Sequence, residues 1–178
     1  MIENKDKIDF PRKNEMYGEV HFLRAFFYFE LVKIYGDVPL FTHGRLTAGD
    51  SGTLTRVPKS EVYAVIESDL NSAISALPAQ KSTDGRATSF TAHALLGKVY
   101  LYQGKYSEAA NILEPLIGLY TLPSNPGSVF LVSGENGPES VFEIQHSKES
   151  NGWNWGWLPQ STEGNFGVIH HGIRGYNG

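Results

Sequence analysis

The chain of 178 residues contains no cysteine. This absence excludes disulfide bonds, thiolate metal sites and cysteine nucleophiles, and it excludes an acylated lipoprotein cysteine within the chain. Residues 1–18 are polar and charged and contain no apolar run, so no signal peptide is present there. We therefore expect either a cytosolic protein or an internal piece of an exported one.

A cluster of basic residues is missing as well. The net charge is −4 at pH 7 and the isoelectric point is about 5.8, which argues against nucleic acid and anionic membranes as partners. The motifs of serine hydrolases, zinc peptidases and P-loop proteins do not occur. Glu143 has no partner carboxylate for glycosidase chemistry, and His170 and His171 would point to opposite faces of a strand. We expect no enzymatic activity, no metal and no cofactor.

The sequence also has few long runs without a charged residue. Even residues 22–35, which are almost continuously apolar, contain charges. Arg24, Glu30 and Lys33 interrupt this stretch and make it unsuitable as a membrane span. The stretch predicts a helix that ends at Gly36, because glycine is favoured just past a helix and a proline follows. A helix this apolar requires neighbouring helices that cover it on several faces.

Three more helices are predicted further along the chain. Residues 58–78 carry one apolar stripe at steps of three and four residues. Residues 88–117 predict two helices with a break at Gly104, and Thr88 or Ser89 is the expected N-cap. The order of these segments predicts a chain of helical hairpins.

The spacing of large and small residues in the last hairpin approximates the tetratricopeptide (TPR) pattern. Gly97 predicts a place where another backbone packs closely, since glycine costs roughly 1 kcal/mol against alanine inside a helix. A generic helical hairpin is the alternative, and it leaves the architecture unchanged. The predicted fold is therefore mainly α, with TPR-like helical hairpins followed after Leu119 by a loop-rich segment with short strands. Residues 140–145 (SVFEIQ) alternate like such a strand.

Three tryptophans lie close together late in the sequence. In an extended segment Trp153, Trp155 and Trp157 would share one face, with Asn154 on the other. Aromatic rings beside amides are typical of sugar-binding sites, so we predict that these four residues contact a glycan. The alternative is that the indoles pack against the helices or anchor a loop. The polar, glycine-rich loop 41–56 is a second candidate contact surface, or else a flexible connector.

Several stretches resemble the SusD/RagB family in their order and spacing. The most specific are LRA at residues 23–25, YGDVPL at 35–40 and DGRAT at 84–88, which leads into a leucine-rich helix. The resemblance covers roughly residues 18–146. It implies a TPR-containing helical scaffold with a more irregular, loop-rich part laid on it, and no catalysis.

Members of this family are lipoproteins that bind glycans or other nutrients on the outer face of the Bacteroidetes outer membrane, over a SusC-like TonB-dependent transporter. The resemblance therefore implies that transporter and an oligosaccharide or polysaccharide as partners, and a membrane attachment through a lipid anchor for which this chain has no cysteine. We expect a fragment, with the N-terminal TPR-type region at 1–118 and the start of the C-terminal loop-rich region at 119–178. A TPR-type protein–protein interaction module is the alternative function, and the identity of the glycan stays open.

Overall fold

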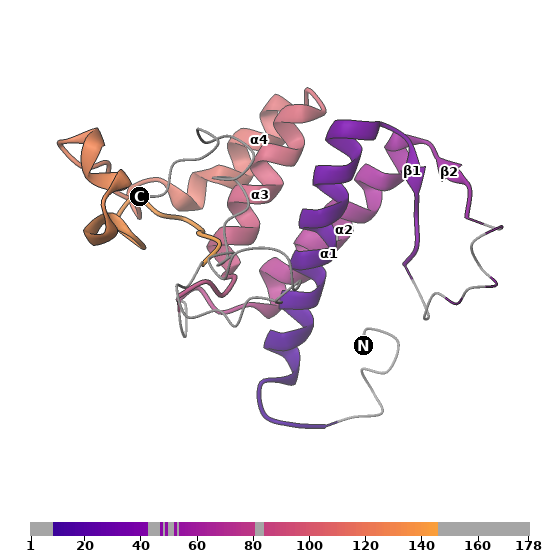
Figure 1. Ribbon diagram of the computed structural model, residues 1–178, viewed down its shortest axis with the longest axis horizontal. Coiled ribbons are helices and arrows are strands. Elements are labelled where there is room, and N and C mark those ends of the chain that lie inside the picture. The colour runs from indigo at the N-terminus through magenta and orange to yellow at the C-terminus, as the bar shows by residue number, and fades with distance from the viewer. Residues whose placement is uncertain are drawn as a thin grey trace, which may run out of the picture. The chain divides into compact units, whose positions relative to one another are not determined.

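The structure is a computed structural model, and it describes residues 9–42, 47, 49, 52, 54–80 and 84–145. The chain divides into two compact units, Met1–Phe142 and Glu143–Gly178. All helices and strands of the described residues belong to the first unit (Figure 1). The boundary expected after residue 118 refers to the regions of the family and stays a prediction.

The first unit is built from four α-helices within the described part of the chain. They are α1 (Lys13–Tyr35), α2 (Lys59–Ala76), α3 (Ser89–Tyr102) and α4 (Tyr106–Leu113). α1 packs against α2, α2 against α3, and α3 against α4 (Figure 1). This order of neighbours confirms the predicted mainly α architecture of successive helical hairpins.

A short antiparallel ribbon joins the first two helices. β1 (Val38–Pro39) pairs with β2 (Arg56–Val57), so that Val38 lies opposite Val57. The pairing returns the chain from the end of α1 to the start of α2, which makes these helices antiparallel neighbours. After α4 the chain forms three short 3₁₀ turns, η3 (Glu114–Leu116), η4 (Pro126–Phe130) and η5 (Val132–Gly134).

The core lies where α1, α2 and α3 face one another. Small side chains at Ala25, Ala73 and Ala92, each 0% exposed, let the helices approach closely. Full burial of each large apolar side chain contributes about 1.5–3 kcal/mol to stability. The largest fully buried apolar side chains are Phe22, Phe29, Val62, Ile66, Leu70, Leu96 and Val99.

The predicted helix ends are confirmed at both sites where the sequence specifies them. Gly36 follows α1 with a φ of 67°, in the left-handed region that glycine tolerates. At the start of α3, the Thr91 N–H donates to Thr88 Oγ1 at 3.1 Å, and the Thr88 N–H donates to Thr91 Oγ1 at 3.2 Å. This reciprocal pair is a capping box, and it makes Thr88 the N-cap.

The expectation that neighbouring helices cover α1 on several faces is wrong for the described residues. α2 and α3 reach α1 from one side, where Phe22, Ala25 and Phe29 are buried. On the opposite side Phe27 is 60% exposed and Ile34 is 69% exposed. The apolar composition of α1 therefore reflects two apolar faces, of which the first unit covers one.

Two local predictions need correction. Gly97 does mark a close approach, but the approaching group is the Leu113 side chain of α4 and not a backbone: a Cβ at Gly97 would lie 2.5 Å from it. Residues 140–145 are irregular instead of a strand. Two of them contact helices of the first unit: the Thr91 hydroxyl donates to the Val141 carbonyl at 3.3 Å, and the Phe142 ring packs against the core.

No helix in the described part of the chain combines the length and the hydropathy that a membrane crossing requires. α1 is long enough at 23 residues, but its charged side chains break the apolar surface.

Candidate functional site

The LRA motif fixes α1 to α2 through one buried carboxylate. Asp69 of α2 is 2% exposed and lies against two α1 side chains. Arg24 donates from Nε and Nη2 to the two carboxylate oxygens at 2.6 and 2.7 Å, and His21 Nδ1 lies 2.6 Å from Oδ1. A two-pronged guanidinium–carboxylate pair holds both side chains in one geometry. The arginine of the motif therefore tethers the two helices.

The same contacts keep the Asp69 carboxyl ionised. Burial raises its pKa, but hydrogen bonds from Arg24 and His21 outweigh burial and hold the pKa of Asp69 below its ordinary value. In return, hydrogen bonding to Asp69 raises the pKa of Arg24. An ionised carboxylate whose oxygens are occupied by these donors suits a structural role, because it has no proton to give to a substrate.

The α1 side chains also anchor the start of the loop 41–56. Arg24 Nη1 donates to the Thr42 carbonyl at 2.8 Å. The Phe41 N–H donates to the Tyr28 hydroxyl at 2.7 Å, and that hydroxyl lies 3.2 Å from the Phe41 carbonyl. These bonds fix the direction in which the loop leaves α1. Most of residues 43–53 lie outside the described part, so the loop as a contact surface stays a prediction.

The YGDVPL motif builds the turn between α1 and α2. Asp37 Oδ1 accepts a hydrogen bond from the Lys59 N–H at 2.8 Å, at the first residue of α2. A carboxylate there satisfies a backbone donor and complements the helix dipole. Arg56 donates to the carbonyls of Asp37 and Tyr35, both at 2.7 Å, and so satisfies acceptors around the end of α1.

The DGRAT motif attaches the start of α3 to the N-terminal half of α1. Arg86 donates from Nε and Nη2 to the two carboxylate oxygens of Glu19 at 2.7 and 2.6 Å. Gly85 has a φ of 79°, which only glycine adopts at low cost, and Thr88 caps the helix. The residues that carry the family resemblance are thus mostly tethers and caps.

A small pocket lies beside the Arg86–Glu19 ion pair. Its volume is about 170 Å³, below the range of about 300–1,000 Å³ typical of ligand pockets. The Phe22 and Phe142 rings meet there edge to face with centroids 5.4 Å apart. Aromatic edges beside a guanidinium and a carboxylate can hold a small amphipathic group, such as part of one sugar ring. The lining residues are Glu19, Phe22, Leu23, Gly85, Arg86, Ala87 and Phe142.

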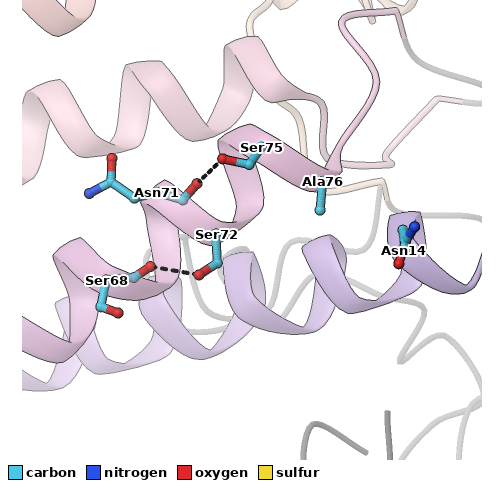
Figure 2. A pocket seen from close by; sticks show the side chains of 6 residues that line it. All are labelled: Asn14, Ser68, Asn71, Ser72, Ser75 and Ala76. Carbon is cyan, nitrogen blue, oxygen red and sulfur yellow. Dashed lines mark hydrogen bonds between the residues drawn. The ribbon is translucent and has the colours of Figure 1, made fainter. Parts of the chain in front are cut away.

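A wider and shallower groove follows α2, and Figure 2 shows its six lining side chains. The Ser72 and Ser75 hydroxyls each donate at 3.0 Å to the backbone carbonyl four residues earlier, and the Asn71 amide donates likewise at 2.8 Å. These donors are used within the helix, and the lining contains no aromatic ring for a sugar to stack on. The groove is therefore the weaker candidate of the two. Its volume is about 880 Å³, and it is lined by Asn14, Ser68, Asn71, Ser72, Ser75 and Ala76.

The residues that the sequence singled out for glycan contact lie outside the described part of the chain. Trp153, Trp155, Trp157 and Asn154 belong to the second unit, and their role stays a prediction. Within residues that the structure does describe, no group of three histidine or acidic side chains is placed to hold a metal ion. The 170 Å³ pocket could not be predicted from the sequence, because its walls come from three separate segments. Among the motifs quoted from the sequence, only DGRAT pointed to this pocket, because it contains the lining residue Arg86.

The fold and these contacts define a helical, TPR-like scaffold with charged tethers between its helices. A family model described as "Starch-binding associating with outer membrane", SusD-like_3, matches residues 1–101, which is more than half of the chain. The chain belongs to the SusD-like family, and the resemblance seen in the sequence is confirmed.

Relatives with known names and structures agree with this assignment. A SusD-like protein of Formosa agariphila is 31% identical over 147 residues, which cover 76% of this chain and 29% of that protein. A laminarin-binding SusD-like protein of known structure is 37% identical with a TM-score of 0.78, over 89% of this chain and 36% of that one. A SusD-like protein of Bacteroides fragilis is 35% identical with a TM-score of 0.70, over 80% and 29%. This chain thus spans about a third of the length of these relatives.

Proposed function

We propose that this chain is part of a non-catalytic glycan-binding component of a Bacteroidetes outer-membrane uptake system. The observation that carries the proposal is the similarity to a laminarin-binding SusD-like protein over 89% of the chain. The description of the matching family, starch binding in association with the outer membrane, supports the same function. The component lies at the extracellular face of the outer membrane and delivers oligosaccharide to a SusC-like TonB-dependent transporter.

Glycan contact is assigned to the tryptophan-rich segment. Trp153, Trp155 and Trp157 stack on the apolar faces of sugar rings, and the Asn154 amide bonds to their hydroxyl groups. Stacking of this kind depends on the flat indole surface and is lost when the ring is removed. The 170 Å³ pocket beside Arg86 is the accessory contact, since its rings and charged groups offer the same combination on a smaller scale.

Affinity gel electrophoresis with laminarin, starch and other polysaccharides tests the binding function. We expect retarded migration of the wild-type chain in at least one gel, with dissociation constants from micromolar to millimolar, or about −8 to −4 kcal/mol. Trp153→Ala and Trp155→Ala should lower the retardation. Phe130→Ala is the matched aromatic control, because Phe130 is 88% exposed and is not among the residues that line the pocket. Free migration of the wild type in every gel would contradict the proposal, and unchanged retardation of both variants would remove the tryptophans from the site.

The remaining parts of the proposal have their own tests. Co-expression with a SusC-like barrel protein from the same organism should yield a complex that survives purification in detergent, and loss of that complex under mild conditions would contradict the transporter partnership. Incubation with the bound polysaccharide should release no new reducing ends. Measured turnover would show that the protein is an enzyme.

A further inference from the structure

One arginine of α1 holds two different parts of the first unit at once. The Arg24 guanidinium donates through Nε and Nη2 to the Asp69 carboxylate of α2, at 2.6 and 2.7 Å. Its third nitrogen, Nη1, donates at 2.8 Å to the carbonyl of Thr42, which follows β1. The Arg24 side chain is only 21% exposed. Arg24 is therefore the point at which the packing of α1 on α2 meets the start of the loop 41–56.

The guanidinium group passes on the orientation that Asp69 gives it. The group is planar and rigid, so two bonds to one carboxylate fix both its position and the direction in which Nη1 points. Asp69 is itself 2% exposed, and His21 Nδ1 lies 2.6 Å from the oxygen that also accepts from Arg24 Nη2. The carboxylate is thus held by two side chains of α1, and it cannot turn without breaking a buried hydrogen bond.

Tyr28 binds the residue next to Thr42. It lies four residues after Arg24, which places both side chains on the same face of α1. Its hydroxyl accepts from the Phe41 N–H at 2.7 Å and lies 3.2 Å from the Phe41 carbonyl. Two successive residues at the start of the loop are therefore bound by two successive turns of α1. Of these two anchors, the one through Arg24 also involves α2.

We propose that Asp69 controls the order of the loop start through Arg24, so that the α1–α2 contact and residues Phe41 and Thr42 are held or released together. Without the charge of Asp69, the guanidinium is no longer fixed toward Thr42, and the bonds between Tyr28 and Phe41 lose their support. The coupling is reciprocal, because a contact that immobilises Thr42 stabilises the bonds between Arg24 and Asp69 by the same free energy. All of these groups lie within the first unit, so the coupling requires no exposed face and does not depend on glycan binding.

Hydrogen exchange of the Phe41 amide, measured by NMR on the full chain, tests this coupling. Tyr28→Phe removes the acceptor of that amide and defines the full loss of its protection. Asp69→Asn should lower the protection about tenfold, which is roughly the difference between a charged and a neutral hydrogen-bond partner. Glu67→Gln is the matched control on α2: it weakens a pair with Lys105 and should leave the protection of the Phe41 amide unchanged.

Two further variants separate this coupling from a general loss of stability. Phe29→Ala removes a ring that is 1% exposed and destabilises the whole unit, but Phe29 is not part of the anchor. The Phe41 amide should therefore lose more protection in Asp69→Asn than in Phe29→Ala. Arg24→Lys should also lower its protection, because one ammonium group cannot replace a two-pronged bond and a third donor at once. Unchanged protection in Asp69→Asn or Arg24→Lys, or a loss in Phe29→Ala that equals or exceeds the loss in Asp69→Asn, would overturn the proposal.

Discussion

The helices α1 to α3 and the segment after α4 contain similar apolar side chains and bury them very differently. Phe29 of α1 is 1% exposed, whereas Phe130 in η4 is 88% exposed. The Phe29 and Tyr102 rings meet edge to face with their centroids 5.2 Å apart, and Lys33 Nζ lies 4.8 Å from the centroid of the Phe29 ring. The 3₁₀ turns after α4 are too short to present a second layer of side chains. An apolar side chain thus becomes core only where a second helix faces it.

Alanine substitution of one phenylalanine in each region should give the largest contrast. Phe29→Ala removes a fully buried ring and should lower the free energy of unfolding by about 3–5 kcal/mol. Phe130→Ala should change it by less than about 0.5 kcal/mol, because an exposed ring loses little on truncation. Urea denaturation followed by circular dichroism measures both. Similar losses for the two variants would show that the segment after α4 shares the core.

The buried carboxylate of the helical region should give the next largest effect. Asp69→Asn weakens the charge-assisted bonds from Arg24 and His21, and it should cost about 2–3 kcal/mol of unfolding free energy. Glu67→Gln is the matched control on the same helix, because Glu67 pairs with Lys105 near the surface and such pairs contribute about 0–1 kcal/mol. Equal losses of stability in the two variants would mean that the buried Asp69 pair contributes no more than the exposed Glu67 pair.

The helical region was predictable because its signals are local. The end of α1 at Gly36 and the cap of α3 at Thr88 follow from one residue and its immediate neighbours. Apolar residues at steps of three and four identified α2 in the same way. Such signals need no knowledge of which segments meet in space.

The partners of the tethers could not be predicted, because they lie far apart in the sequence. Glu19 and Arg86 are 67 residues apart, and Arg24 and Asp69 are 45 apart. Residues 140–145 show the opposite failure: their alternation is local and strand-like, but they form no strand, and Val141 and Phe142 contact helix side chains instead of another strand. The predicted glycan residues, from Trp153 to Trp157, lie outside the described residues, so sequence alone supports that part of the site.

A substitution at Gly97 should have a smaller effect on stability, and it tests how closely α4 packs on α3. A Cβ at this position would lie 2.5 Å from the Leu113 side chain, which has to shift. Gly97→Ala should therefore cost about 1–2 kcal/mol, even though alanine favours helix by roughly 1 kcal/mol. The double variant Gly97→Ala with Leu113→Ala should lose less than the sum of the two single variants. Stabilisation by Gly97→Ala alone would show that α4 packs loosely on α3.

The smallest expected effect is the pH dependence of the free energy of unfolding that arises from the contacts of Asp69 with Arg24 and His21. The pKa of Asp69 in the folded chain is below its ordinary value, and the unfolded carboxyl titrates near about 3.9. As the pH falls, the Asp69 carboxyl is therefore protonated in the unfolded chain before it is protonated in the folded chain. The stability that the ionised carboxylate contributes is complete above about pH 5 and is lost as the pH falls through and below about 4. The difference in unfolding free energy between the wild type and Asp69→Asn should shrink over that range, measured by urea denaturation at a series of pH values. A difference that stays constant down to about pH 3 would mean that Arg24 and His21 do not stabilise the charged form, and that the tether is held by packing between the helices instead.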